Sequence, residues 1–187
     1  KTFTHVKFLQ TFGTSETGIA TTKSESSNST FFEIIDKNQE YKIVNNELWL
    51  RSKTQIKGYI NNSNENFTSD GWFKTGDIVE MKDKYFKIIG RKNEVINVGG
   101  EKVIPSEIEN IILELDDIID CTVKGEKNPI TGQYVVADIV TNNNDTKKLK
   151  ITIKKHCRIK LDSYKVPVKI SFKKSLKYTN RFKRKIQ

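Results

Sequence analysis

Short runs in which apolar and polar residues alternate dominate the first half of the chain, and this period of two is typical of β-strands. The runs predict strands over residues 6–10, 41–44, 47–51, 78–81 and 85–89. Asn45-Asn46 separates the second run from the third, and asparagine tolerates the positive φ of a tight turn. We therefore expect at least two β-hairpins, within a small barrel or twisted sheet, before about residue 90.

The periodicity changes after residue 90. Pro105 suits the first turn of a helix, and Ser106 with Glu109 has the spacing of a capping box. An apolar stripe at helical spacing follows, formed by Ile108, Ile111, Ile112 and Leu115. A second, lysine-rich helix is predicted around Leu149, Ile153, Cys157 and Leu161. With strands expected over residues 121–123, 134–140 and 166–172, this half predicts a compact α+β unit.

Composition and length limit the class of protein. A chain of 187 residues is long enough for one large or two small domains. It begins at Lys1 rather than at methionine, so we expect a fragment of a longer protein. No apolar run has the length of a membrane span, and no signal-peptide pattern is present. Cys121 and Cys157 lack metal-ligand spacing, so we expect two small core residues and a cytoplasmic setting.

The net charge of +10 is unevenly distributed. Residues 1–145 carry 17 lysines and arginines against 22 acidic residues, whereas residues 146–187 carry 16 against one. Such a block can bind nucleic acid or a membrane surface, or it can be a solvated basic face. It lacks the interleaved aromatic residues of a single-strand stacking platform, which favours the solvated face. A basic face could still attract a polyphosphate.

Four stretches, taken in order, carry a more specific signal. They are Phe12-Gly13-Thr14-Ser15-Glu16, Gly71-Trp72-Phe73-Lys74-Thr75-Gly76-Asp77, the run from Gly90-Arg91 to Glu109, and the terminal segment 176–183. Together they resemble the adenylate-forming (AMP-binding) enzymes, and most closely the acyl-CoA synthetases. The match over residues 90–109 is the most specific of the four.

The resemblance implies a nucleotide site in the first half. Phe12 would pack on adenine, Gly13, Thr14 and Ser15 would meet phosphate, and Glu16 would hold Mg²⁺, a hard cation that shares carboxylates with substrate phosphates. Asp77 would accept hydrogen bonds from the ribose hydroxyls. Two positions depart from the usual pattern. Ser15 replaces a threonine and keeps the hydroxyl, and Phe12 replaces a tyrosine and loses it.

The same resemblance assigns roles around residue 100. Arg91 would reach the ribose or phosphate of the nucleotide, and Lys102 would approach phosphate in one pose. Asn93 stands at the family's hinge position, where Asp or Lys is commoner, and asparagine adopts unusual φ and ψ readily. Gly99 and Gly100 would allow the close backbone approach that the pantetheine of CoA needs, although a glycine pair alone is more often an ordinary turn.

Lys183 resembles the catalytic lysine of the family. An ammonium group can meet both a carboxylate and the α-phosphate while negative charge moves between them. The residue before it is Phe182 rather than the usual glycine, and Lys177 stands where proline is usual. Because other basic residues surround it, a solvated lysine is the alternative.

The sequence therefore predicts an α/β multidomain arrangement. Residues 1–90 would be the end of the large AMP-binding domain with its β-barrel, and residues 91–187 a mobile α+β C-terminal lid. The expected function is an ATP-dependent acid–thiol ligase that uses ATP, Mg²⁺ and CoA, with a carrier-protein pantetheine as the alternative acceptor. No phosphate loop appears, so the chain alone is expected to be inactive. A non-catalytic basic module that binds nucleic acid is the alternative from another class.

Overall fold

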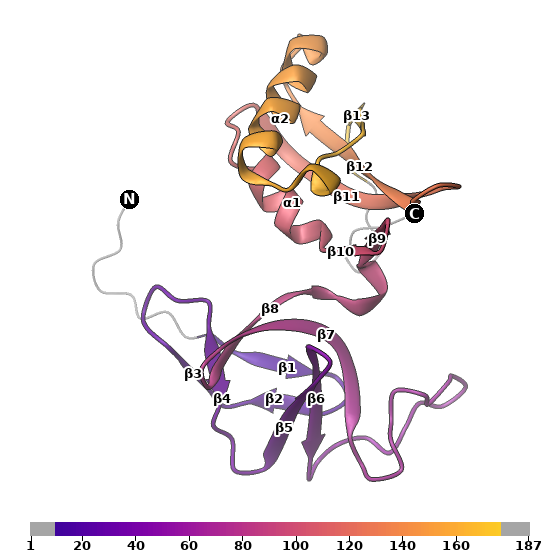
Figure 1. Cartoon of the computed structure of the whole chain (residues 1–187). Coiled ribbons are helices and arrows are strands. Elements are labelled where there is room, and N and C mark those ends of the chain that lie inside the picture. Colours follow the sequence, from indigo (N-terminus) through magenta and orange to yellow (C-terminus); the bar gives the residue numbers. More distant parts are fainter. Residues whose placement is uncertain (1–9, 177–187) are drawn as a thin grey trace. The chain divides into compact units, whose positions relative to one another are not determined.

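The computed structural model of the chain describes residues 10–176, which divide into two compact units (Figure 1). The first unit is Lys1–Lys92 and the second is Asn93–Gln187. The strand predicted over residues 6–10 lies outside the described residues except for Gln10, and so does Lys183. Each unit is described below by itself.

The first unit is built from antiparallel strands. Its six-stranded sheet has the order β3-β4-β8-β7-β6-β5, and β1 pairs with β2 beside it. The strands are β1 (Phe12–Thr14), β2 (Gly18–Ala20), β3 (Thr22–Ser24), β4 (Phe32–Ile34), β5 (Gln39–Val44), β6 (Glu47–Ser52), β7 (Phe73–Lys82) and β8 (Tyr85–Arg91). Strands β7 and β8 are long and curved in Figure 1, which gives the sheet its curl.

Both predicted hairpins are confirmed. Asn45 and Asn46 connect β5 to β6 with φ values of 52° and 63°, the conformation of a two-residue hairpin turn. Asp83, with φ of 53°, begins the turn from β7 to β8. Strand β7 is longer than predicted: the alternation indicated residues 78–81, whereas the strand already begins at Phe73. The core between them is aromatic: Phe32 and Phe86 have ring centroids 4.7 Å apart and are almost fully buried.

The second unit packs two helices on a sheet. Strands β11 (Ile118–Asn128) and β12 (Gly132–Thr141) form a long hairpin, β13 (Lys169–Lys173) pairs parallel to β12, and the short hairpin β9 (Ile96–Val98) and β10 (Glu101–Val103) meets the start of β12. The helices are α1 (Pro105–Ile112) and α2 (Thr146–Lys160), with 3₁₀ turns η1 (Lys92–Glu94) and η2 (Ser163–Lys165).

The core of this unit follows both expected periods. Ile108 and Ile112 of α1 and Leu149, Ile153 and Cys157 of α2 are buried, as the stripes predicted. On the sheet, alternate residues face the same core, namely Cys121, Val123, Val135, Ala137 and Ile139. The apolar positions of helices and strands thus meet in one cluster.

The expected capping box is wrong. Helix α1 begins at Pro105 with Ile104 as its N-cap residue, and Ile104 makes no side-chain cap hydrogen bond. Ser106 is therefore the second residue of the helix and not its N-cap. Oε1 of Glu109 accepts a hydrogen bond from the backbone N–H of Val123 on β11, 2.8 Å away, so this carboxylate also has a tertiary partner.

Candidate functional site

The Thr75-Gly76-Asp77 motif lies inside β7, opposite the end of β8. Asp77 and Arg91 are direct partners in the antiparallel register. Nε of Arg91 is 2.9 Å from Oδ1 of Asp77, and its Nη1 donates to the carbonyl oxygen of Thr75 at 2.8 Å. The structure therefore brings together two residues that the sequence assigned to nucleotide binding, although they are fourteen positions apart in the chain.

Asp77 is held in a buried position by polar neighbours. The hydroxyl of Thr75 donates to the carbonyl oxygen of Leu48 at 2.7 Å and accepts the backbone N–H of Asp77 at 3.0 Å. Glu47 is buried as well, and its carboxylate accepts the N–H of Gly76 at 3.2 Å and pairs with Nζ of Lys92 at 2.9 Å. Buried carboxylates are stable only when paired in this way, so the motif has a built polar support.

The sequence reading missed Glu47 and the supporting role of Thr75. Glu47 had one available signal: an acid that directly follows the Asn45-Asn46 turn and opens the apolar strand Leu48–Leu50. An acid at the start of such a strand needs a partner once the strand is buried. Which partner it finds depends on β7 and β8, so the pairing with Lys92 required the fold.

The pair of Asp77 and Arg91 combines acceptors with donors. A carboxylate only accepts hydrogen bonds, and a guanidinium only donates them, in a planar fork. Asp77 is almost fully buried, whereas about half of the Arg91 side chain is exposed. Such a pair suits a ligand that carries both hydroxyl groups and phosphate oxygens.

The predicted phosphate turn is the hairpin of β1 and β2. Gly13 stands opposite Ile19, and a Cβ atom at Gly13 would lie 2.8 Å from the carbonyl oxygen of Gly18 and from Cα of Ile19. Because both of these atoms belong to the backbone, no side chain fits there. Glycine at position 13 is thus required by the hairpin itself.

Hydroxyl groups stabilise the turn of this hairpin. Oγ1 of Thr14 accepts the backbone N–H of Thr17 at 3.0 Å and lies 2.9 Å from Oγ1 of Thr17. Thr17 is buried, and its hydroxyl also accepts Nε2 of Gln39 at 2.9 Å. Ser15 is exposed at the turn. Of the two predicted phosphate hydroxyls, Thr14 therefore has an intramolecular role, and Ser15 is the more accessible.

Glu16, the predicted metal ligand, is tied to a distant loop. Oη of Tyr59 donates to Oε1 of Glu16 at 2.5 Å, and the backbone N–H of Ile56 donates to the carbonyl oxygen of Glu16 at 3.0 Å. The hydrogen bond to Glu16 raises the pKa of Tyr59 to about 12, because it stabilises the protonated phenol. The sequence reading did not single out Tyr59.

Glu16 fits a Mg²⁺ site in which the protein supplies a single carboxylate. Within residues 10–176, no group of three or more His, Cys, Asp and Glu side chains is placed to hold a metal. A Mg²⁺ ion at Glu16 would then take most of its ligands from nucleotide phosphates and water, which is the usual arrangement for this ion with one or two protein carboxylates.

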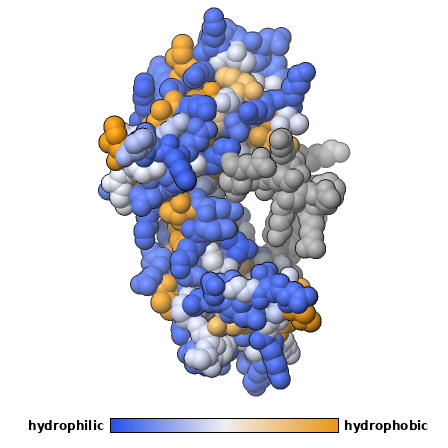
Figure 2. Space-filling view, turned by 90° about the vertical axis from the view of Figure 1, so that its right-hand side faces the viewer, coloured by the Kyte–Doolittle hydropathy of each residue, from blue (hydrophilic) through white to orange (hydrophobic). Residues whose placement is uncertain are grey.

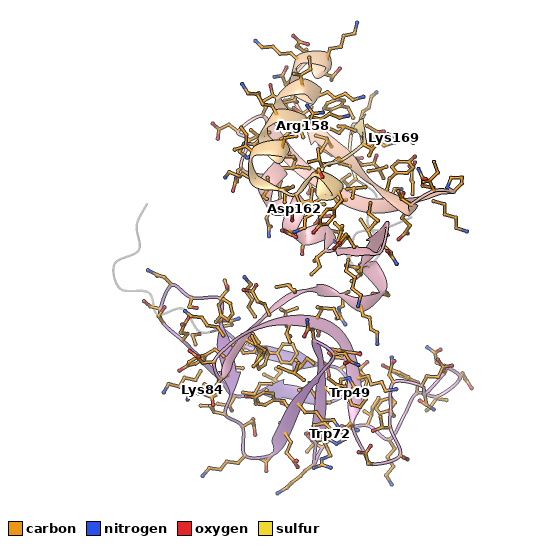
Figure 3. All side chains as sticks on the ribbon, viewed as in Figure 1. Trp49, Trp72, Lys84, Arg158, Asp162 and Lys169 are labelled. Carbon is orange, nitrogen blue, oxygen red and sulfur yellow. The ribbon has the colours of Figure 1, made fainter. Side chains whose placement is uncertain are left out.

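Phe12 lies against the core. Its ring centroid is 5.8 Å from that of Phe32, and the side chain is partly buried in the aromatic cluster of the first unit. Trp72, labelled in Figure 3, comes shortly before Thr75, and the charged groups of Lys42 and Arg51 lie 4.2 Å and 4.5 Å from its ring centroid. Trp72 therefore anchors the strand through cation–π contacts.

The other predicted residues around position 100 belong to the second unit. Asn93 is exposed in η1, and Lys102 is exposed on β10. Gly99 and Gly100 form the two-residue turn between β9 and β10, with φ values of 62° and 95° that favour glycine. A Cβ atom at either glycine would meet no atom of residues 10–176 within 4 Å.

Several lysines of the basic block pair with acidic residues within the second unit. Lys160 pairs with Glu114, Lys165 with Glu107 and Lys169 with Glu126, at 2.5 to 3.1 Å. The acidic partners come from the part of the chain before residue 146, which explains how two regions of opposite charge fold together. Figure 2 shows a mainly hydrophilic face with separate hydrophobic spots. Among residues 10–176, no helix is long and apolar enough to cross a membrane.

Comparison with known proteins gives consistent results. Residues 107–183 match the AMP-binding enzyme C-terminal domain. The chain is 31% identical over 137 residues to a long-chain-fatty-acid–CoA ligase of Haemophilus influenzae, which covers 72% of this chain and 24% of the relative. It is 32% identical over 133 residues to a 2-succinylbenzoate–CoA ligase of Bacillus licheniformis, which covers 67% of this chain and 26% of the relative. The chain thus spans about a quarter of these curated relatives.

Solved structures agree with these relatives. An anthranilate CoA ligase in complex with anthranoyl-AMP superposes with a TM-score of 0.71 at 26% identity, over 79% of this chain and 32% of that one. The fold alone is shared with ATP-bound MatB from Rhodopseudomonas palustris, with a TM-score of 0.79 at 20% identity, over 93% of this chain and 38% of that one. This chain belongs to the AMP-binding enzymes and corresponds to their C-terminal portion.

Proposed function

We propose that the full-length protein containing this chain is an ATP-dependent acid–CoA ligase. The observation that carries the proposal is the buried Asp77 paired with Arg91 on neighbouring strands, supported by Thr75 and Glu47. This arrangement presents acceptors and donors to a ribose and a phosphate. The names of the relatives, which are CoA ligases, support the same activity.

The reaction has two steps. A carboxylate oxygen attacks the α-phosphorus of ATP and pyrophosphate leaves, which gives an acyl-adenylate. The thiol sulfur then attacks the acyl carbon, and AMP leaves as the thioester forms. Asp77 would accept from the ribose hydroxyls, Arg91 would donate to the nucleotide, and Phe12 would pack on adenine with its remaining exposed surface.

Phosphate binding is proposed for the β1–β2 hairpin and for Lys102. The backbone at Gly13, the accessible hydroxyl of Ser15 and, more weakly, Thr14 would meet phosphate oxygens. Glu16 would hold Mg²⁺, which would neutralise charge on the phosphates. Lys183, which lies outside the described residues, would stabilise the charge that moves between carboxylate and α-phosphate.

We further propose that the second unit acts as a mobile lid that turns about Asn93. The support is that the chain divides between Lys92 and Asn93 and that Asn93 lies in a short exposed 3₁₀ turn. Hinges are commonly residues of short connections between larger elements, and η1 connects β8 to β9. The Gly99-Gly100 turn, where a Cβ atom would meet no atom of the described residues within 4 Å, would receive the pantetheine arm of the thiol.

CoA is the favoured acceptor, because the relatives are named as CoA ligases. A carrier-protein pantetheine arm presents the same thiol, and the two are distinguished by supplying each to preformed acyl-adenylate. Nucleic-acid binding is the less favoured function, since acidic partners neutralise several lysines of the basic block. Duplex or single-strand binding that falls steeply with salt would favour it instead.

The proposal is tested on the full-length protein in two stages. A thermal-shift screen of carboxylic acids with ATP selects candidate substrates, and ATP–pyrophosphate exchange with each acid then measures adenylation. We expect exchange that depends on one class of acid. Absence of exchange with every stabilising acid, together with salt-dependent nucleic-acid binding, would exclude the ligase in favour of the binding module.

A further inference from the structure

The loop between β6 and β7 reaches back to the β1–β2 hairpin at two points. The backbone N–H of Ile56 donates to the carbonyl oxygen of Glu16 at 3.0 Å, and Oη of Tyr59 donates to Oε1 of the same residue at 2.5 Å. Glu16 is thus held by its main chain and by its side chain, from residues that are 40 and 43 positions away. A carboxylate on a turn would otherwise sample several rotamers.

Tyr59 is itself fixed by its surroundings. Its backbone N–H donates to Oδ1 of Asn64 at 2.6 Å, and its ring meets the ring of Phe67 edge-on at 5.6 Å between centroids. Phe67 in turn packs on Phe73, with centroids 5.0 Å apart, where β7 begins. The hydroxyl of Tyr59 is therefore presented from an ordered aromatic cluster that continues into the strand of Asp77.

The hydrogen bond from Tyr59 occupies Oε1 of Glu16 and leaves Oε2 available for a ligand. Within residues 10–176, no hydrogen bond or ion pair forms to Oε2 of Glu16. A metal ion at Glu16 would then be bound through one oxygen, in an orientation that the tyrosine sets. Partners that orient a metal-binding carboxylate in this way commonly change metal affinity when they are removed.

We propose that Tyr59 is a positioning residue that orients Glu16 for a divalent cation bound together with the nucleotide phosphates. The inference rests on the proposed function, in which Glu16 is the metal-binding carboxylate. Tyr59 acts through Glu16 and does not itself contact the cation.

The chain contains a matched control for this pair. Oη of Tyr134 donates to Oε2 of Glu126 at 2.7 Å, on neighbouring strands of the second unit. Tyr134→Phe removes the same type of hydrogen bond, between the same residue types, at a position with no proposed part in metal binding. Tyr59→Phe keeps the ring that contacts Phe67 and removes only the hydroxyl.

The experiment measures cation binding directly in the full-length protein. Mn²⁺ serves as the probe, and free Mn²⁺ is followed by electron paramagnetic resonance in the presence of a non-hydrolysable ATP analogue. We expect Tyr59→Phe to weaken Mn²⁺ binding by roughly tenfold, and Tyr134→Phe to leave it unchanged. In the Glu16→Gln background, Tyr59→Phe should have no further effect, because the two residues act as one unit.

Kinetics give the second readout. Tyr59→Phe should raise the Mg²⁺ concentration for half-maximal pyrophosphate exchange by a similar factor, while kcat at saturating Mg²⁺ stays within about twofold of the wild type. A purely structural tyrosine would instead lower kcat at every Mg²⁺ concentration and lower the thermal unfolding midpoint.

The possible outcomes distinguish the positioning role of Tyr59 from the proposed ligase activity. Unchanged Mn²⁺ binding in Tyr59→Phe, an equal loss in Tyr134→Phe, or additive losses with Glu16→Gln would overturn the positioning role, as would a wild type that binds no Mn²⁺ with the nucleotide. A wild type that binds Mn²⁺ with the nucleotide but shows no pyrophosphate exchange with any acid would reject the proposed ligase activity. The Mn²⁺ comparison would still decide the role of Tyr59.

Discussion

The two units use their buried positions differently. Among the described residues, the core cluster of the second unit contains fourteen buried apolar residues, against seven in the first. Five buried polar residues lie in the first unit, namely Thr17, Gln39, Glu47, Thr75 and Asp77, whereas Thr122 is the one described in the second. The first unit therefore contains a polar network inside its sheet, and the second is a packed apolar scaffold.

This difference indicates where substitutions should affect function. A buried polar network costs desolvation free energy and contributes stability only when every group is paired. Under the proposed function, the network around Asp77 would fix the ligand-binding surface of this unit from its interior. In the second unit, the proposed functional groups are exposed at Asn93, at the Gly99-Gly100 turn and at Lys102, so its interior should affect stability more than chemistry.

The largest expected effect on activity comes from Lys183. This residue belongs to the second half of the chain, so the effect would be an exception to the contrast between the two units. Lys183 lies outside the described residues. Lys183→Ala should slow adenylation by about 3–4 kcal/mol of transition-state stabilisation, on the order of a few hundredfold. Transfer from preformed acyl-adenylate should change little. Pyrophosphate exchange and single-turnover transfer measure the two steps.

Lys185→Ala provides the control for that prediction, since it removes a neighbouring lysine of the same basic segment. If both variants behave alike, or if Lys183→Ala slows the two steps equally, Lys183 is a solvated lysine.

Asn93→Pro tests the hinge. Proline fixes φ near −65° at a position that would have to change conformation between the two steps. We expect thioester formation to fall on the order of a hundredfold, the loss typical of a misplaced reacting group, while adenylation is affected far less. The two half-reactions are measured separately, and an equal loss in both would contradict a hinge at this residue.

Asp77→Ala tests the polar interior of the first unit. Removal of a charged acceptor for the ribose hydroxyls should cost about 1.5–3 kcal/mol, which raises the KM for ATP roughly tenfold to a hundredfold. Asp138→Ala removes an acid whose partner Lys173 is 3.9 Å away on the sheet of the second unit, and it should leave this KM unchanged. Equal KM values for ATP in the wild type and Asp77→Ala would show that Asp77 has only a structural role in β7.

Ile153 and Ile151 test the apolar interior of the second unit within one helix. Ile153 is fully buried, whereas Ile151 is 70% exposed. Ile153→Ala should lower the free energy of unfolding of this unit by about 2–5 kcal/mol, and Ile151→Ala by less than about 0.5 kcal/mol. Similar losses from both variants would show that α2 does not bury the face that carries Ile153.

The chain offers separate probes for that measurement. Both of its tryptophans, Trp49 and Trp72, belong to the first unit, and both described α-helices belong to the second. In a urea titration, tryptophan fluorescence therefore reports the first unit and the helical circular-dichroism signal the second. We expect Ile153→Ala to shift only the helical transition.

The smallest expected effect concerns pH. Hydrogen bonds from Lys160 and then His156 lower the pKa of Glu114, which connects the end of α1 to α2. A folded-state pKa below the unfolded value contributes stability above the unfolded value, about 4.3, and this contribution is lost as the pH falls through the folded value. Glu114→Gln should therefore lower the urea midpoint slightly at pH 7, and this difference should disappear in acid. A difference that persists at low pH would exclude the charge as its cause.

Local periodicity predicted much of each unit. The Asn45-Asn46 turn needs positive φ at two successive residues, and the stripes of α1 and α2 repeat at helical spacing, so both were readable without tertiary information. The expected capping box was wrong because α1 begins at Pro105, with Ile104 and not Ser106 as its N-cap residue. Tyr59 was missed because its partner Glu16 is 43 positions away, which no local pattern indicates.

The sequence by itself determined the two β-hairpins, the two α-helices and the residues that resemble the family motifs, because these depend on side-chain spacing along a few turns or strands. Only the tertiary structure decided which polar groups pair. Asp77 meets Arg91 because the register of β7 and β8 aligns them, and Glu47 meets Gly76 and Lys92 because β6 lies beside β7. Burial makes an unpaired charge costly, so the fold, and not the local sequence, selects the partner of each buried carboxylate.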